Sequence, residues 1–173
     1  IKGHDRVGFL QVADEKSFID FWLIEELFAN FDSMQASIFL YKARGGKICM
    51  GPVWDFDIGV NNVSYTNINP ESWYCANTCM IFKELLNEPV FRKNVAARIV
   101  ELYNTEWQYL LKSAADVKNA IRPAWDRNYT RWDYKEKVFE TPSWIIALED
   151  FDDQVEYIRT WLSKRMEFLY GYG

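Results

Sequence analysis

Three aspartates in the first third of the chain have the residue type and spacing for metal and phosphate chemistry. Asp55 and Asp57 are separated by one residue, so in an extended backbone their side chains point to the same face. Two neighbouring carboxylates repel each other, and a divalent cation such as Mg²⁺, which binds one or two carboxylates together with phosphate oxygens and water, relieves that repulsion. The pair is therefore a candidate metal site. The alternative is that these carboxylates accept backbone hydrogen bonds in a turn.

Asp32 is expected to lie beside this pair despite the long stretch of sequence between them. Two β-rich runs, 37–43 and 47–53, flank Arg44-Gly45-Gly46, a pattern typical of a β-hairpin. A hairpin returns the chain to its starting end, so the residues before and after it become neighbours. In phosphoryl transfer one carboxylate orients the acceptor hydroxyl while another holds the metal, and Asp32 is the candidate for the first task.

The elements that must position these residues are mostly helical. A Ser17–Asp20 capping box and apolar residues at helical spacing predict a helix over 17–29. Pro123 is expected to kink or break a later helix. The remaining predictions are a short strand at 7–12, a loop at 58–74, helices at 78–87, 89–111 and 113–136, and a last helix that starts at Thr141-Pro142 and buries Ile145, Leu148, Phe151, Val155, Ile158, Leu162 and Leu169. The predicted fold class is α+β, mostly α, with an embedded hairpin.

Composition indicates one globular domain spanning residues 1–173. The chain is 49% hydrophobic and 17% aromatic, which is enough apolar material for a well-buried core. Its net charge of −5 gives nucleic acid no basic stripe to bind, and no run of residues is apolar enough to span a membrane. One His and three Cys are a poor supply for zinc. Cys75 and Cys79 are either two buried thiols or, in an oxidising compartment, a disulfide.

Beyond these patterns, the chain resembles the spore-coat protein H (CotH) kinase-like family. The specific part of the resemblance is Phe18-Ile-Asp-Phe-Trp-Leu-Ile-Glu-Glu-Leu-Phe-Ala-Asn30, followed by Asp32, Tyr41-Lys42, Lys47 and Pro52-Val-Trp-Asp-Phe-Asp57. Later segments, among them Phe82-Lys-Glu-Leu-Leu-Asn87 and Trp161-Leu-Ser-Lys-Arg165, extend it over nearly the whole chain. The resemblance implies a protein-kinase-like fold that uses ATP with Mg²⁺ or Mn²⁺ to phosphorylate protein side chains.

The resemblance also implies separate roles for the aspartates. Asp32 is similar to the family's catalytic-loop aspartate, Asp55 to its metal-binding aspartate, and Asp57 to the second acidic position of its Trp-Asp-x-Asp motif. Family members carry an Asn for a second metal shortly after the catalytic aspartate. Here only Gln35 or Ser37 could substitute for it.

Residues 1–16 contain no phosphate-covering loop and no lysine suited to the nucleotide phosphates. The chain is therefore expected to be the C-terminal lobe of a CotH kinase-like domain, without the N-terminal lobe, with unidentified nucleotide-binding residues and no activity on its own.

Two functions remain open from the sequence. The first is an atypical protein kinase that transfers the γ-phosphoryl group of ATP to protein hydroxyls. The second is a catalytically silent CotH-like module that binds or assembles partners on a cell surface. The resemblance implies an extracellular or cell-surface location, and the expected partner is a protein substrate or a surface-assembly protein. The retained aspartates favour the first function, and the missing Asn favours the second.

Overall fold

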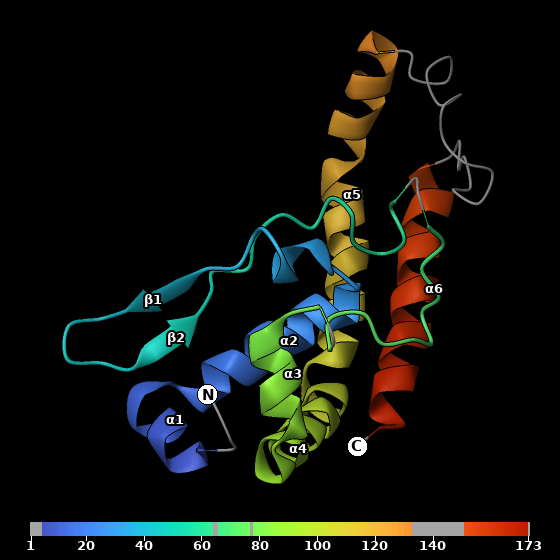
Figure 1. Ribbon diagram of the computed structural model, residues 1–173. Helices are drawn as coiled ribbons and strands as arrows, with labels where there is room; N and C mark the ends of the chain where they lie inside the picture. Colours follow the sequence, from blue (N-terminus) through green and yellow to red (C-terminus); the bar gives the residue numbers. More distant parts are fainter. Residues whose placement is uncertain (1–4, 64–65, 77, 133–150, 173) are drawn as a thin grey trace.

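The computed structural model describes residues 5–63, 66–76, 78–132 and 151–172. This part of the chain is mostly helical with one small antiparallel hairpin, which confirms the predicted α+β, mostly α class (Figure 1). The elements are α1 (Arg6–Val12), α2 (Glu15–Phe28), the 3₁₀ turn η1 (Asp32–Met34), β1 (Leu40–Lys42), β2 (Ile48–Met50), α3 (Met80–Asn87), α4 (Pro89–Thr105), α5 (Trp107–Arg131) and α6 (Phe151–Tyr170).

Helix α2 is the centre of the fold. It contacts α4, α6 and β2, and aromatic rings join it to its other neighbours. Phe18 meets Phe9 of α1 edge-on with ring centroids 5.2 Å apart, and Phe21 stacks on Phe82 of α3 at 6.2 Å. Most of its surface is covered, which makes it a core element, and only the side that carries Lys16, Asp20 and Ile24 is open to solvent. Its buried residues are Phe18, Ile19, Phe21, Trp22, Leu23, Glu25, Glu26 and Leu27.

The start of α2 lies earlier than the Ser17–Asp20 capping box predicts. Asp14 is the N-cap, and its side chain accepts a hydrogen bond from the Ser17 amide at 2.8 Å. The Ser17 hydroxyl donates to the Asp14 carbonyl and accepts from the Met50 amide. Asp20 instead pairs with Lys16 and Arg98. Ser17 therefore links the helix start to β2 rather than capping the helix.

The hairpin is present as predicted but shorter. Leu40 pairs with Met50 and Lys42 with Ile48, and the Gly51 amide continues the ladder by donating to the Phe39 carbonyl at 3.0 Å. Pro52 follows immediately and cannot donate a backbone hydrogen bond, so the ladder ends there. β2 packs on α2, whereas β1 is exposed along its length and projects from the helices (Figure 1).

Helices α3 and α4 begin close to their predicted positions. Pro89 is the first residue of α4, and the Glu88 side chain caps it by accepting from the Val90 and Phe91 amides. Of the two outcomes predicted for Pro123, a kink or a break, the break is wrong, because α5 continues through this residue. A helix-interior proline frees the carbonyl four residues earlier, here that of the exposed Asn119, where solvent can hydrate it.

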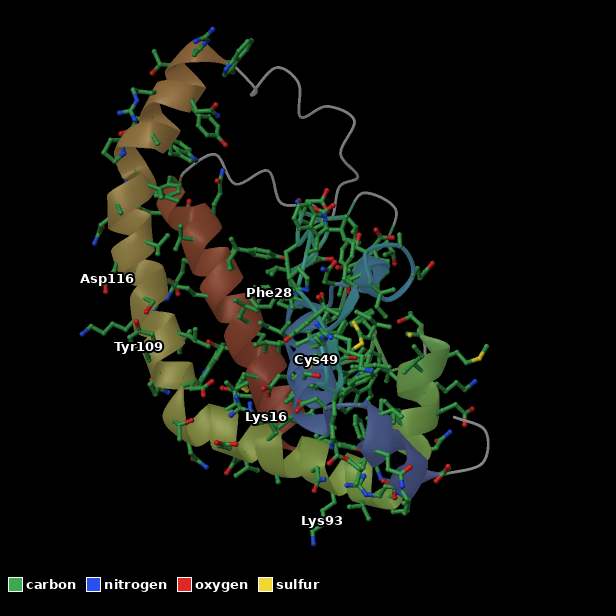
Figure 2. All side chains as sticks on the ribbon, turned by 90° about the vertical axis from the view of Figure 1, so that its left-hand side faces the viewer. Lys16, Phe28, Cys49, Lys93, Tyr109 and Asp116 are labelled. Carbon is green, nitrogen blue, oxygen red and sulfur yellow. The ribbon has the colours of Figure 1, made fainter. Side chains whose placement is uncertain are left out.

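Helices α5 and α6 lie side by side (Figure 1), and Figure 2 shows Tyr109 and Asp116 on the side of α5 away from α6. The predicted start of the last helix at Thr141-Pro142, with Ile145 and Leu148, lies outside the described residues. The burial prediction is wrong for Ile158, which is 43% exposed. Trp161 and Arg165 face the core instead, because the buried stripe of α6 is rotated relative to the predicted one.

The predicted strand at 7–12 is also wrong. These residues lie in α1, which Asp5 caps by accepting from the Gly8 amide at 2.8 Å. In the part of the chain that the structure describes, no helix combines the length and apolar character needed to cross a membrane.

Candidate functional site

The site begins at the C-terminal end of α2, where the chain reverses. Ala29 adopts the left-handed conformation, with φ 50° and ψ 40°. The Asn30 amide then reaches back to the Glu25 carbonyl at 2.9 Å, the long-range bond of a Schellman ending. This reversal brings the side chain of Asn30 back alongside α2. Its Nδ2 atom donates to Oε2 of Glu25 at 2.9 Å.

Asp55 lies at the same place. Nδ2 of Asn30 also donates to the main-chain carbonyl of Asp55, again at 2.9 Å. Asn30 immediately precedes the Phe31-Asp32 segment, so its Cα is within about 7 Å of the Cα of Asp32. The hairpin therefore returns the Asp55 backbone to the neighbourhood of Asp32, as the sequence suggests.

The premise that Asp55 and Asp57 share an extended strand is wrong. Asp55 has φ 62°, in the left-handed region, and Asp57 lies in a turn in which the Gly59 amide donates to the Phe56 carbonyl. The period-two argument for a common face therefore does not apply. Both carboxylates are nevertheless exposed to solvent.

Each of these two aspartates has its main chain held by an asparagine amide. Asn30 donates to the Asp55 carbonyl, and Nδ2 of Asn62 donates to the Asp57 carbonyl at 2.6 Å. The anchored main chain and the exposed carboxylate are compatible with a ligand-binding role for the side chain. Sequence reasoning missed both asparagines. The sequence signals them only by position, because Asn30 follows the end of α2 and Asn62 follows the segment that contains Asp57.

Asp32 begins the 3₁₀ turn η1, where its carbonyl accepts from the amides of Gln35 and Ala36 at 2.8 and 3.0 Å. Its side chain is exposed, as is that of Gln35, while Ser37 is half-buried. The hydroxyl of Ser33 donates to the Asn30 carbonyl at 2.6 Å. Asn30 is thus bonded to the Asp32 turn through its main chain and to Asp55 through its side chain.

A second set of contacts fastens the aspartate segment to α2. The Val60 amide donates to the Phe28 carbonyl at 2.8 Å, and the Phe28 and Phe56 rings meet edge-on with centroids 5.2 Å apart. Gly59 lies so close that a Cβ atom there would be 3.2 Å from the Phe56 carbonyl oxygen and 3.3 Å from that of Phe28. The segment from Asp55 to Val60 is consequently in close backbone contact with the end of α2.

Glu25 is the buried acid beneath this arrangement. Its side chain is fully buried, and desolvation raises its pKa to about 7, although the hydrogen bond from Asn30 opposes the shift. Among the described residues, Oε1 of Glu25 and Oδ1 of Asn30 have no hydrogen-bond partner. Glu25 therefore changes its protonation state near neutral pH, and Asn30 connects it by hydrogen bonds to the main chain of Asp55.

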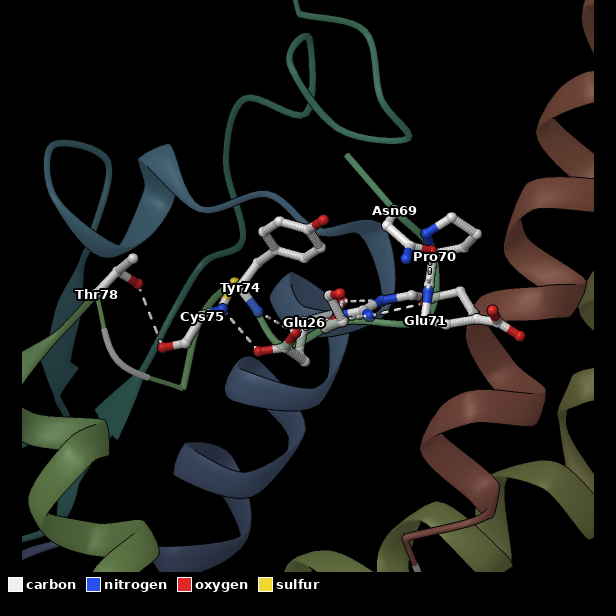
Figure 3. Close-up of polar contacts among 9 residues, drawn as sticks. Glu26, Asn69, Pro70, Glu71, Tyr74, Cys75 and Thr78 are labelled. Atoms are coloured by element: carbon white, nitrogen blue, oxygen red, sulfur yellow. Dashed lines mark hydrogen bonds and ion pairs between the residues drawn. The ribbon is translucent and has the colours of Figure 1, made fainter. Parts of the chain in front are cut away.

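The neighbouring Glu26 holds the loop that follows the site. Its carboxylate accepts from the Tyr74 and Cys75 amides at 2.9 and 2.7 Å (Figure 3). Arg165 of α6 donates to the Glu26 side chain and to the Pro70 carbonyl. Burial raises the pKa of Glu26, and the Arg165 charge and the backbone amides oppose this rise. Cys75 and Cys79 are free and buried, and burial also raises the pKa of the Cys75 thiol.

The three aspartates do not form a ready-made metal cage. Within residues 5–63, 66–76, 78–132 and 151–172, no three His, Cys, Asp or Glu side chains form a group that could hold a metal ion. The donor chemistry nevertheless suits a hard cation, because Asp55 and Asp57 offer carboxylate oxygens that are open to solvent.

The site thus consists of a mostly helical domain with an exposed aspartate motif after a short hairpin, and comparison with known families shows the class of protein. The sequence pattern of the CotH kinase protein family matches residues 9–169. The chain therefore belongs to the CotH kinase protein family. Neither a search of curated proteins nor a search of solved structures found a match to the chain.

Proposed function

We propose that this chain is a single domain that carries the phosphoryl-transfer half of an ATP-dependent protein kinase site, equivalent to the C-terminal lobe of a kinase-like domain. The observation that carries the proposal is the junction at Asn30, which joins the turn of Asp32 to the main chain of Asp55 while both carboxylates stay exposed. Membership of the CotH kinase protein family supports the same reaction class.

In this proposal Asp32 accepts a hydrogen bond from the acceptor hydroxyl, orients it and takes its proton. Asp55 and Asp57 bind Mg²⁺ or Mn²⁺ on the ATP phosphates, with Gln35 or Ser37 as substitutes for the family's second-metal Asn. The cation supplies neutralisation of the charge on the transferred phosphoryl group. One or two carboxylates suffice for Mg²⁺ when phosphate and water complete its coordination, so the proposal needs no cage of three acidic side chains.

A metal titration with nucleotide tests the proposal. In the parent protein we expect Mn²⁺ to bind together with ATP, as measured by electron paramagnetic resonance of the Mn²⁺, and Asp55→Ala to weaken this binding at least tenfold. Asp32→Asn should retain binding and lose phosphate transfer in the parent protein. Asp116→Asn, an exposed change on α5, is the control and should match wild type. No binding at millimolar ATP, or equal binding by wild type and Asp55→Ala, would overturn the proposal.

The second function is a catalytically silent module that binds a partner protein on a cell surface. The observation in its favour is the segment 33–37, which contains no Asn after Asp32. The titration separates the two functions, because a catalytically silent module is expected not to bind Mn²⁺ with ATP. An extracellular or surface location belongs to both versions of the proposal.

A further inference from the structure

The amide of Asn30 makes both of the hydrogen bonds that its two N–H groups allow. One goes to Oε2 of Glu25 and the other to the carbonyl of Asp55. Asn30 and Glu25 are both fully buried, so neither bond is exchanged for a bond to solvent. A side-chain amide that donates to a buried carboxylate has a fixed orientation, because rotating it by 180° would turn its oxygen toward two acceptors.

Asp55 needs such an anchor, since its backbone lies in the left-handed region that non-glycine residues rarely adopt. Conformations of this kind persist where the surroundings fix them, and they occur often at functional sites. The only side chain that is seen to bond the Asp55 carbonyl among the described residues is Asn30. The Asp55 carboxylate, in contrast, is exposed.

We infer that Asn30 is a positioning residue for metal binding: held by Glu25, its amide fixes the main chain of Asp55 so that the Asp55 carboxylate is presented to the cation. The inference rests on the proposed function for the identity of the ligand. It adds two residues, Asn30 and Glu25, that touch neither the metal nor the phosphate. Removal of groups that orient metal ligands weakens metal binding by about 10- to 100-fold.

The test compares Asn30→Ala with Val95→Ala, a core truncation in α4 that also destabilises the protein. The first readout is the affinity for Mn²⁺ with ATP. We expect Asn30→Ala to weaken it about tenfold or more, while Val95→Ala stays within twofold of wild type. Glu25→Leu removes the acceptor that orients Asn30 and should resemble Asn30→Ala. If Asn30→Ala shows no cooperative melting, Asn30→Ser replaces it.

The second readout needs no metal. The Gly59 amide donates to the Phe56 carbonyl, so its hydrogen exchange reports on the order of the Asp55 segment. We expect exchange at Gly59 to become at least tenfold faster in Asn30→Ala, relative to an amide in α4, and to stay unchanged in Val95→Ala.

Each outcome has a distinct meaning. If Asp55→Ala weakens Mn²⁺ binding but Asn30→Ala does not, the positioning role is wrong while the proposed function stands. If Asp55→Ala has no effect, the proposed function fails, and unchanged exchange at Gly59 in Asn30→Ala then overturns the anchoring role as well. Weaker binding together with faster exchange in Asn30→Ala alone supports the inference.

Discussion

The guanidinium of Arg165 donates to both the side chain and the main-chain carbonyl of Glu26, a residue 139 positions earlier in the chain. Both residues are fully buried. Arg165 also donates to the Pro70 and Ser72 carbonyls, so this one side chain connects α2, α6 and the loop between the aspartate motif and α3. The buried ion pair thus closes the fold around the loop that leaves the candidate site.

Arg165→Met should therefore be strongly destabilising. It leaves the Glu26 carboxylate buried without its counter-charge, and removal of one partner of a buried pair costs about 3–5 kcal/mol. Urea unfolding followed by circular dichroism measures the loss. The control is Arg159→Met, because Arg159 forms a largely exposed pair with Glu156 on the same helix and should cost about 0.5 kcal/mol or less. Equal midpoints for the two variants would contradict a structural role for the buried pair.

The acid beneath Asp55 predicts a specific pH dependence of stability. The folded pKa of Glu25 is about 7, above its ordinary value of 4.5. Below the ordinary value the group is protonated in both states and costs nothing. As the pH rises from there to about 7, the unfolded state gains from releasing its proton while the folded state holds it, so stability falls. Above pH 7 the penalty stays constant at about 3 kcal/mol.

Glu25→Gln should remove this penalty and keep an oxygen that accepts from Asn30. We expect the variant to gain stability over wild type as pH rises from 5 to 8, by up to about 3 kcal/mol, with little difference at pH 4.5. Denaturant unfolding at a series of pH values gives the difference curve, in which other carboxylates cancel. A constant difference between the two proteins across this range would contradict a raised pKa.

The sequence predicts those features that depend on local pattern. Phe18, Phe21 and Trp22 recur at helical spacing, and all three lie in α2. Arg44-Gly45-Gly46 predicts a hairpin turn, and this segment connects β1 to β2. The pattern is less informative where two local preferences compete. Val7–Val12 has the β-branched residues of a strand, yet the Asp5 cap and the packing of Phe9 on Phe18 favour a helix.

Long-range polar partners are what the sequence could not supply. From the sequence, Arg165 is expected on the solvent-exposed side of an amphipathic helix. Its burial is explained only by its ion pair with Glu26. Asn30 likewise reads as a helix end, and its bond to Asp55 depends on the path of the whole hairpin. The sequence indicates the candidate aspartates because they are close in sequence or flank the hairpin. Asn30, which holds Asp55, is 25 positions away from it, and no local pattern links the two residues.

The cap of α2 provides a stability prediction that separates the observed helix start from the predicted one. Asp14→Ala removes the acceptor for the Ser17 amide and should cost about 1 kcal/mol. Asp116→Ala, an exposed change within α5, is the matched control and should change stability by less than about 0.5 kcal/mol. Thermal melting measures both. A neutral Asp14→Ala would instead favour a helix that begins at the Ser17–Asp20 box.

Gly59 links packing to the candidate site. A Cβ atom at this position would lie 3.2 and 3.3 Å from the carbonyl oxygens of Phe56 and Phe28, and both are backbone atoms that cannot swing aside. Gly59→Ala should therefore push the Asp55–Val60 segment away from α2 and lengthen the Val60 bond to Phe28. We expect a cost of about 1–3 kcal/mol, the usual range for overpacking.

Gly46→Ala in the hairpin turn is the matched control, because its nearest backbone atom would be 3.4 Å away, in ordinary contact, and the substitution should be close to neutral. Urea unfolding gives the cost of each change, and hydrogen exchange at the Val60 amide reports whether the segment has moved. Faster exchange at Val60 in Gly59→Ala alone would show that the aspartate segment depends on its backbone contact with α2. Equal stability and equal exchange in the two variants would contradict a role for this contact in holding the segment.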